Sequence, residues 1–249
     1  MDDPGLLSLQ VYQSEAYQVF MRLQTFSSNY YVFHRNYQEL NQLLSSTQNP
    51  DTFFDLWTQD KRPELVMVMN EVARLFHNFL ASAKTLVDHT RALVDDWYTE
   101  SKFFEEYKAE VQKRFIGNST IGFVEELRNY ALHFSMPLSR AVVRFATDSD
   151  TKQTTPIQTF VIDKAELIKW SKWTAKGRSY LDSAGDEIVI KELADRYFQE
   201  INNFQVWMQR RLEDVHMDEL NWLNDMGQRV ENALNKLRAD QSAQDSKSA

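Results

Sequence analysis

Helix-breaking residues are scarce in this chain of 249 residues, which contains only six glycines and five prolines. Glycine and proline turn or interrupt a chain, and β-sandwiches or barrels need many of them. Residues 6–46 contain neither, and apolar side chains recur there at intervals of three and four. That spacing predicts one long helix with a single buried stripe. The scarcity of breakers therefore favours a bundle of long helices.

Further helices are predicted in the first half of the chain. They are a short piece at 52–58 and longer helices at 63–98, 101–115 and 119–134. Prolines in first turns and small polar capping residues mark their starts, as is common at helix N-termini. Together with the first helix they are expected to form a helical core over residues 1–138.

Beyond Pro137 the period of the apolar residues changes. Residues 141–145 are largely apolar with adjacent β-branched valines, and residues 157–162 alternate at period two, so a small β-hairpin is predicted. A short helix is expected at 163–173, followed by a loop at 174–186.

From about residue 187 the helical period returns, and either one very long helix or two helices joined near His216 would fit it. Residues 139–238 are expected to pack on the helical core, and the polar residues 239–249 to form a disordered tail. The predicted fold is mainly α: a long-helix bundle with a small β-hairpin insertion and a long C-terminal helix or helices.

Composition excludes several classes of function. The chain has no cysteine, which rules out disulfides, thiolate metal sites and cysteine nucleophiles and is typical of a reducing cytosol. The N-terminus has no secretory pattern and no apolar run reaches the roughly 18 residues of a membrane span, so a cytoplasmic protein without membrane contact is expected. A net charge of −8 argues against broad affinity for nucleic acid, so any such site must be local.

Motifs for cofactors and metals are missing from the sequence. No glycine-rich turn leads into a helix with a lysine, and no serine occupies a nucleophile elbow. The five histidines lack the spacing that tetrahedral or di-iron sites use. We therefore expect no metal and no cofactor.

The predicted helix at 119–134 carries Arg128, Asn129 and His133 close together. Histidine exchanges protons near neutral pH, and arginine offers a planar donor fork to a phosphate that gains charge in a transition state. Asn129 and His133 share a helix face, whereas Arg128 reaches the same pocket only from the flank. One helix alone makes an incomplete site, and two copies facing each other across a dimer axis would supply the missing groups.

A second polar feature lies on the predicted helix at 63–98. Four polar, formally uncharged side chains fall within about 60° of one another on one helix face. They are Asn78, Ser82, Thr85 and His89. This stripe is either the edge of a solvated side or a surface that faces another polar element and supports the candidate site.

Residues 127–133, Leu-Arg-Asn-Tyr-Ala-Leu-His, resemble the Arg-x4–6-His motif of the HEPN superfamily, in which asparagine often follows the arginine. The resemblance covers roughly residues 63–137, and the polar stripe could match the helix that packs beside the motif. It implies a HEPN-like bundle whose active members are metal-independent endoribonucleases, cutting RNA by 2′-OH attack at a homodimer interface.

On this hypothesis Arg128 stabilises phosphate charge, His133 acts as acid or base, and Asn129 orients or binds the substrate. Many such proteins serve in toxin–antitoxin or antiphage defence, so RNA, a second copy of the chain and a regulatory protein are the partners implied. Arg211 and His216 have the same spacing, but no asparagine follows Arg211 and the residues between them are acidic, which would repel phosphate.

Two alternatives stay open. The motif can be structural, with Arg128 pairing with Glu125 or another carboxylate. The chain can also be a noncatalytic helical interaction or scaffold protein, which its acidic charge, long aromatic-rich helices and six tryptophans favour.

One basic-aromatic cluster occurs near the middle of the second half. It is either an RNA contact or a solvated surface segment. Its residues are Lys169, Trp170, Lys172, Trp173, Lys176 and Arg178.

Overall fold

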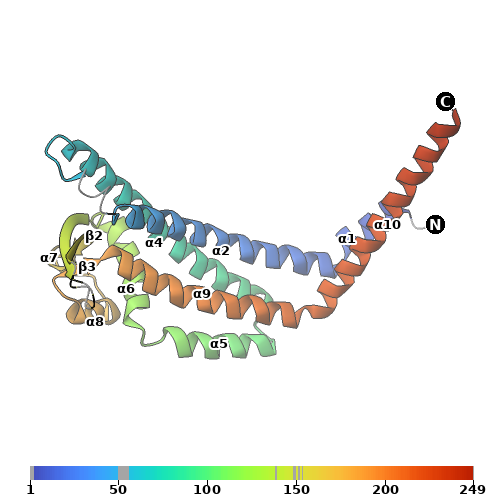
Figure 1. Ribbon diagram of the computed structural model, residues 1–249. Coiled ribbons are helices and arrows are strands. Elements are labelled where there is room, and N and C mark those ends of the chain that lie inside the picture. The colour runs from blue at the N-terminus through green and yellow to red at the C-terminus, as the bar shows by residue number, and fades with distance from the viewer. Residues whose placement is uncertain are drawn as a thin grey trace. The chain divides into compact units, whose positions relative to one another are not determined.

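The computed structural model describes residues 3–49, 56–137, 139–147, 150, 152 and 154–248. It is mainly helical, with a small three-stranded antiparallel sheet and long C-terminal helices, which confirms the predicted fold class (Figure 1). The chain divides into two compact units, one formed by Met1–Ser28 with Val206–Ala249 and the other by Asn29–Gln205. None of the described helices is long and apolar enough to cross a membrane.

The helix predicted at 6–46 is interrupted once. It forms α1, Pro4–Gln13, and α2, Glu15–Ser46, with Ser14 between them in extended conformation. The Ser14 hydroxyl donates to the Val11 carbonyl at 2.7 Å and accepts from the Tyr17 amide at 3.1 Å. Serine thus replaces helical hydrogen bonds with its own side chain, which ends one helix and begins the next.

The next three helices follow the prediction closely. They are α4, Arg62–Tyr98, α5, Lys102–Phe115, and α6, Ser119–His133. Their junctions carry the expected signals, because Gly117 has φ of +88° and the Asn118 side chain accepts the amides of Thr120 and Ile121. Most of the short helical piece predicted at 52–58 lies outside the described residues.

The predicted hairpin is present. Strands β1, Ser139–Thr147, and β2, Thr154–Asp163, pair antiparallel, with Ser139 opposite Ile162. A third strand, β3, Glu187–Val189, pairs with the end of β2. Three residues are too few to show an alternating pattern, so the sequence does not reveal this strand.

The segment after the hairpin differs from the prediction. The helix expected at 163–173 is only one turn, α7, Lys164–Leu167, and the region expected to be a loop contains α8, Ala175–Ser183. The Glu126 carboxylate of α6 accepts the amides of Thr174 and Gly177 at 2.8 and 3.3 Å. A side chain distant in sequence therefore stabilises the start of α8, which local patterns cannot predict.

Two helices complete the chain, and they meet at His216. These are α9, Ile190–Val215, and α10, Met217–Ser248. The residues expected to form a disordered tail are helical as far as Ser248. The polar composition of this segment suggested disorder, but no glycine or proline after Gly227 interrupts the helix.

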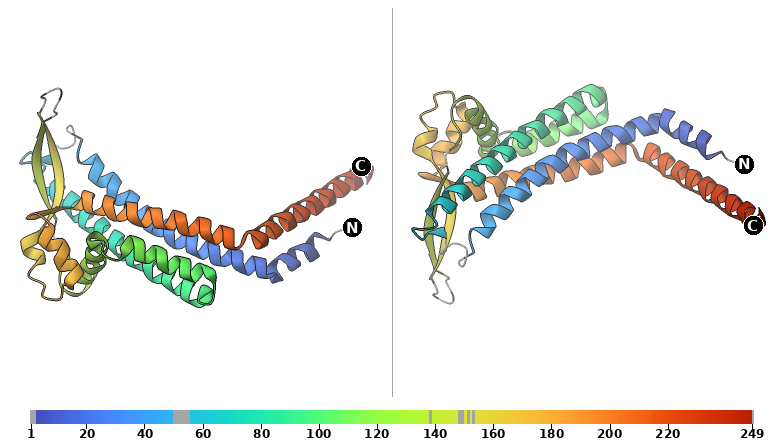
Figure 2. Two further views of the ribbon diagram at one scale, coloured as in Figure 1. Left: turned by 90° about the horizontal axis from the view of Figure 1, so that it is seen from below. Right: turned by 90° about the horizontal axis from the view of Figure 1, so that it is seen from above.

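The Asn29–Gln205 unit has an aromatic core. Phe33, Phe79 and Tyr197 are almost completely buried, and the rings of Tyr37 and Phe198 stack at 3.7 Å. Helices α4 and α6 pack together in this core, while the sheet, α7 and α8 gather at one end of the unit (Figures 1 and 2). In the other unit α1 packs against α10, with Leu7 and Met226 buried.

Candidate functional site

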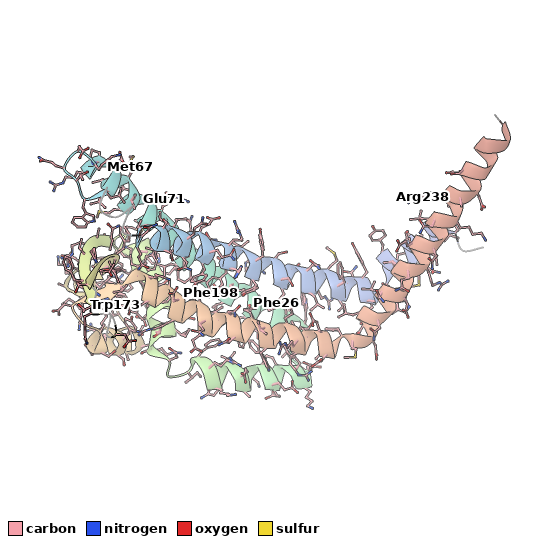
Figure 3. All side chains as sticks on the ribbon, in the orientation of Figure 1. Phe26, Met67, Glu71, Trp173, Phe198 and Arg238 are labelled. Carbon is pink, nitrogen blue, oxygen red and sulfur yellow. The ribbon has the colours of Figure 1, made fainter. Side chains whose placement is uncertain are left out.

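Buried aromatic side chains anchor α6. Phe123 stacks on Tyr180 at 4.2 Å, and Tyr130 lies 5.8 Å from Trp173, where α6 meets the α7–α8 segment. Trp173 is labelled in Figure 3, at the end of the unit that holds the sheet. Leu127 and Tyr130, both within the motif, are 0% and 3% exposed. These contacts fix one side of the helix, while Arg128 and Asn129 are half-buried and His133 is exposed.

Arg128 is half-buried, and its guanidinium is incompletely satisfied. Its Nη1 donates to Asn129 Oδ1 at 3.3 Å, whereas its Nε is buried without a hydrogen-bond partner. Within the described parts of the chain Arg128 has no ion pair, so the pairing with Glu125 or another carboxylate that a structural role could involve is not seen there. Because arginine keeps its proton at all accessible pH values, this positive charge is available to an anion such as a phosphate.

His133 is the last residue of α6 and is exposed to solvent. It stands between two exposed apolar side chains, Leu132 at 47% and Phe134 at 52%. An accessible imidazole can exchange protons with a ligand, and its apolar neighbours offer a surface for contact with another molecule.

The predicted polar stripe of α4 is held by other contacts. Ser82 and Thr85 donate to carbonyls of their own helix at 3.0 Å, and His89 Nδ1 lies 2.9 Å from Asn29 Oδ1 on α2. Asn78 is half-buried. Among the residues that the structure describes, no hydrogen bond or ion pair joins this stripe to Arg128, Asn129 or His133.

Arg211 and His216, which have the same sequence spacing as Arg128 and His133, lie in a different environment. Arg211 lies 3.3 Å from the Asp214 carboxylate, and His216 lies 3.5 Å from that of Glu219. A carboxylate therefore already lies beside each of the two groups. The pair is therefore a suitable internal comparison for Arg128 and His133.

The basic-aromatic cluster separates into a core part and a surface part. Trp170 and Trp173 are 7% and 5% exposed, and the Trp173 indole donates to the Leu167 carbonyl at 2.7 Å. The indole rings therefore cannot stack on RNA bases, because the core covers them. The four cations of the cluster stay at the surface, where Lys169 pairs with Glu166.

The structure also contains a cavity that the sequence did not indicate, between α4, α5, α6, α8 and α9. Thr90 and Gln205 line it, and both are 4% exposed. In the sequence, the sign of this cavity was the position of these two polar residues inside otherwise apolar helix stripes. Across the described residues, no group of three or more potential ligands from His, Cys, Asp and Glu is placed to hold a metal ion.

Comparisons of the chain with protein-family models, with curated proteins and with solved structures gave no match.

Proposed function

We propose that this protein is a HEPN-like, metal-independent endoribonuclease whose site includes Arg128, Asn129 and His133. The observation that carries the proposal is the half-buried Arg128 guanidinium, which has a buried Nε without an acceptor and no ion pair within the described residues. Buried donors are rarely left unpaired in native proteins, and an RNA phosphate would supply both the acceptor and the counter-charge.

In the proposed reaction the ribose 2′-OH attacks the adjacent phosphorus. A base removes the 2′ proton, the bond from phosphorus to the 5′ oxygen breaks, and an acid protonates that leaving oxygen. The product ends are a 2′,3′-cyclic phosphate and a 5′-hydroxyl. Arg128 stabilises the charge on the phosphate oxygens, and Asn129, already bonded to Arg128, orients it.

A single imidazole cannot accept the 2′-OH proton and donate a proton to the 5′ oxygen in the same step. A homodimer would place a second His133 at the same phosphate. The exposed Leu132 and Phe134 beside His133 supply apolar surface for this contact. The proposal extends, through the resemblance alone, to a role in toxin or antiphage defence with a regulatory protein partner.

The test is cleavage of a structured RNA in the presence of EDTA. We expect Arg128→Ala and His133→Ala each to lower the rate by roughly 100-fold or more, as removal of an acid–base or phosphate-binding group does. Arg211→Ala and His216→Ala, which have the same spacing, should retain wild-type rates. The nuclease proposal would be refuted if the wild-type protein cleaved no RNA. It would also be refuted if the Arg211 and His216 variants lost as much of the cleavage rate as the Arg128 and His133 variants.

A noncatalytic interaction or scaffold role is the second candidate, and the exposure of Leu132 and Phe134 favours it. The double variant Leu132→Asp/Phe134→Asp separates the two by light scattering and by the cleavage assay. If the protein is a dimeric nuclease, this variant should lose both the dimer and the cleavage activity. The scaffold role predicts self-association that this variant abolishes, in a protein without ribonuclease activity.

A further inference from the structure

A cavity of about 230 Å³ lies within the Asn29–Gln205 unit. That volume is larger than a single water molecule needs and smaller than a drug-sized site. Apolar side chains from four helices form most of its wall. They include Leu86 of α4, Val111 and Phe115 of α5, Ile121 of α6, and Ile201 and Phe204 of α9.

Two polar atoms in this wall have no hydrogen-bond partner among the described residues. Thr90 Oγ1 and Gln205 Oε1 are buried without a hydrogen bond, and both side chains belong to residues that are only 4% exposed. An amide end can present either its oxygen or its nitrogen, so Gln205 can accept from or donate to a ligand. Native proteins seldom bury such groups unpaired, which points to a bonding partner inside the cavity.

A second hydroxyl without a partner among the described residues belongs to the fully buried Tyr197. Burial, reinforced by the negative charge of Glu125, raises the pKa of Tyr197, while Arg91 opposes this rise. The hydroxyl therefore stays protonated and remains a donor. Glu125 and Arg91 line the cavity, whereas Tyr197 is not among its lining residues.

The rim of the cavity is positively charged. Arg91 and Lys176 are exposed lining residues, and neither has an ion pair in the described portion of the chain. The Lys176 stem lies against Gly122 of α6, where an added Cβ would sit 2.9 Å from Lys176 Cβ. Glu125, the half-buried carboxylate in the lining, offsets one of the two charges and leaves a net positive rim.

We propose that this cavity binds a small amphipathic acid. Its apolar body occupies the space between the helices, a hydroxyl or amide group bonds Thr90 and Gln205, and its carboxylate lies at Arg91 and Lys176. An apolar wall with a few placed polar groups is the usual composition of a small-molecule site. The inference does not depend on ribonuclease activity.

Titration calorimetry on the full chain tests the proposal with four probes. Phenylacetate and octanoate carry the apolar body and acid, 4-hydroxyphenylacetate adds a hydroxyl, and tyramine replaces the acid with a cation. We expect one site, with 4-hydroxyphenylacetate bound about tenfold more tightly than phenylacetate and tyramine the weakest. If no acid binds at about 5 mM, the proposal is wrong.

Variants locate the site. Arg91→Gln should weaken acid binding about fivefold or more, whereas Lys172→Gln, a nearby exposed cation outside the lining, should change it less than about twofold. Thr90→Val keeps the side-chain shape and should remove the advantage of the hydroxylated acid. Equal effects of Arg91→Gln and Lys172→Gln would mean that the acid binds the general surface, which also overturns the proposal.

Discussion

Arg128 differs from the other arginines that help to hold this fold. Arg140 and Arg144 both donate to the Glu187 carboxylate across the sheet, and Arg74 pairs with Glu71 one turn away. Among the described residues Arg128 has only the neighbouring Asn129 as a partner and keeps a buried donor unpaired. Its side chain is thus positioned by packing, and its charge is not used by the described parts of the fold.

Replacing Arg128 should therefore cost little stability. We expect Arg128→Met, which keeps an apolar stem, to change the free energy of unfolding by less than about 1 kcal/mol, because no ion pair is lost. Leu127→Ala, at a fully buried neighbour, should cost about 2–5 kcal/mol. Urea unfolding measures both, and a loss above about 2 kcal/mol in Arg128→Met would indicate a structural role.

Tyr37 makes stability depend on pH in the alkaline range. Burial, then its hydrogen bond to Asp195 at 2.9 Å and the charge of that carboxylate, raise the pKa of Tyr37 from 10.0 to about 12. The folded state thus holds the phenolic proton more tightly than the unfolded state. The resulting stabilisation is complete below pH 10 and is lost as the pH rises towards 12.

Tyr37→Phe should be less stable than wild type by on the order of 1 kcal/mol near neutral pH, after allowance for solvent screening of a partly exposed group. We expect this difference in stability between wild type and Tyr37→Phe to narrow between pH 10 and 12, where the wild type loses the hydrogen bond from Tyr37 to Asp195. Urea unfolding at a series of pH values measures it. Tyr31→Phe, at an exposed position of the same helix, is the control and should show no such gap.

At the scale of elements, the junction between α5 and α6 is set by a glycine and a cap. Gly117 adopts φ of +88°, which L-residues with a side chain rarely do, and Asn118 then caps α6 through two backbone amides. The start of the helix that carries the candidate site is therefore fixed by two consecutive residues.

Gly117→Ala should destabilise the protein by about 1 kcal/mol, because alanine resists the left-handed conformation. Gly185→Ala is the matched control, since Gly185 has open space around its Cα and no positive φ. The free energy of unfolding of Gly185→Ala should lie within about 0.5 kcal/mol of the wild-type value or slightly exceed it. Thermal unfolding compares the two, and equal effects would contradict the assignment of strain to residue 117.

At the scale of the whole molecule, the two compact units share α2 and α9, because the divisions at Ser28 and Gln205 fall inside these helices. Both units bury apolar side chains. The larger unit has stacked aromatic rings, whereas α10 of the other unit is buried chiefly at Met226 and is exposed from Leu234 onwards as far as its side chains are described.

Removal of residues 239–249 should leave the unfolding midpoint within about 2 °C of wild type, because this segment has no large apolar side chain to bury. The helical signal in circular dichroism should fall, since this segment is helical to Ser248. Met226→Ala, at a residue 5% exposed, should cost about 2–5 kcal/mol. An unchanged helical signal after truncation would favour the disordered tail that composition suggested.

The sequence by itself determined the helices at 62–98, 102–115 and 119–133 and the hairpin that follows. Periodicity, caps and breakers act over three or four residues, so these features are encoded locally. The position and residue types of the Arg128–His133 motif were also evident, whereas its chemistry stays a prediction.

Only the tertiary structure decided what each side chain meets. Glu126 supports α8 across 48 residues of sequence, Trp170 and Trp173 enter the core instead of facing solvent, and Arg128 remains without a carboxylate. The cavity beside Thr90 exists because several helices far apart in sequence come together. Such contacts depend on how distant segments pack, and no local pattern records that arrangement.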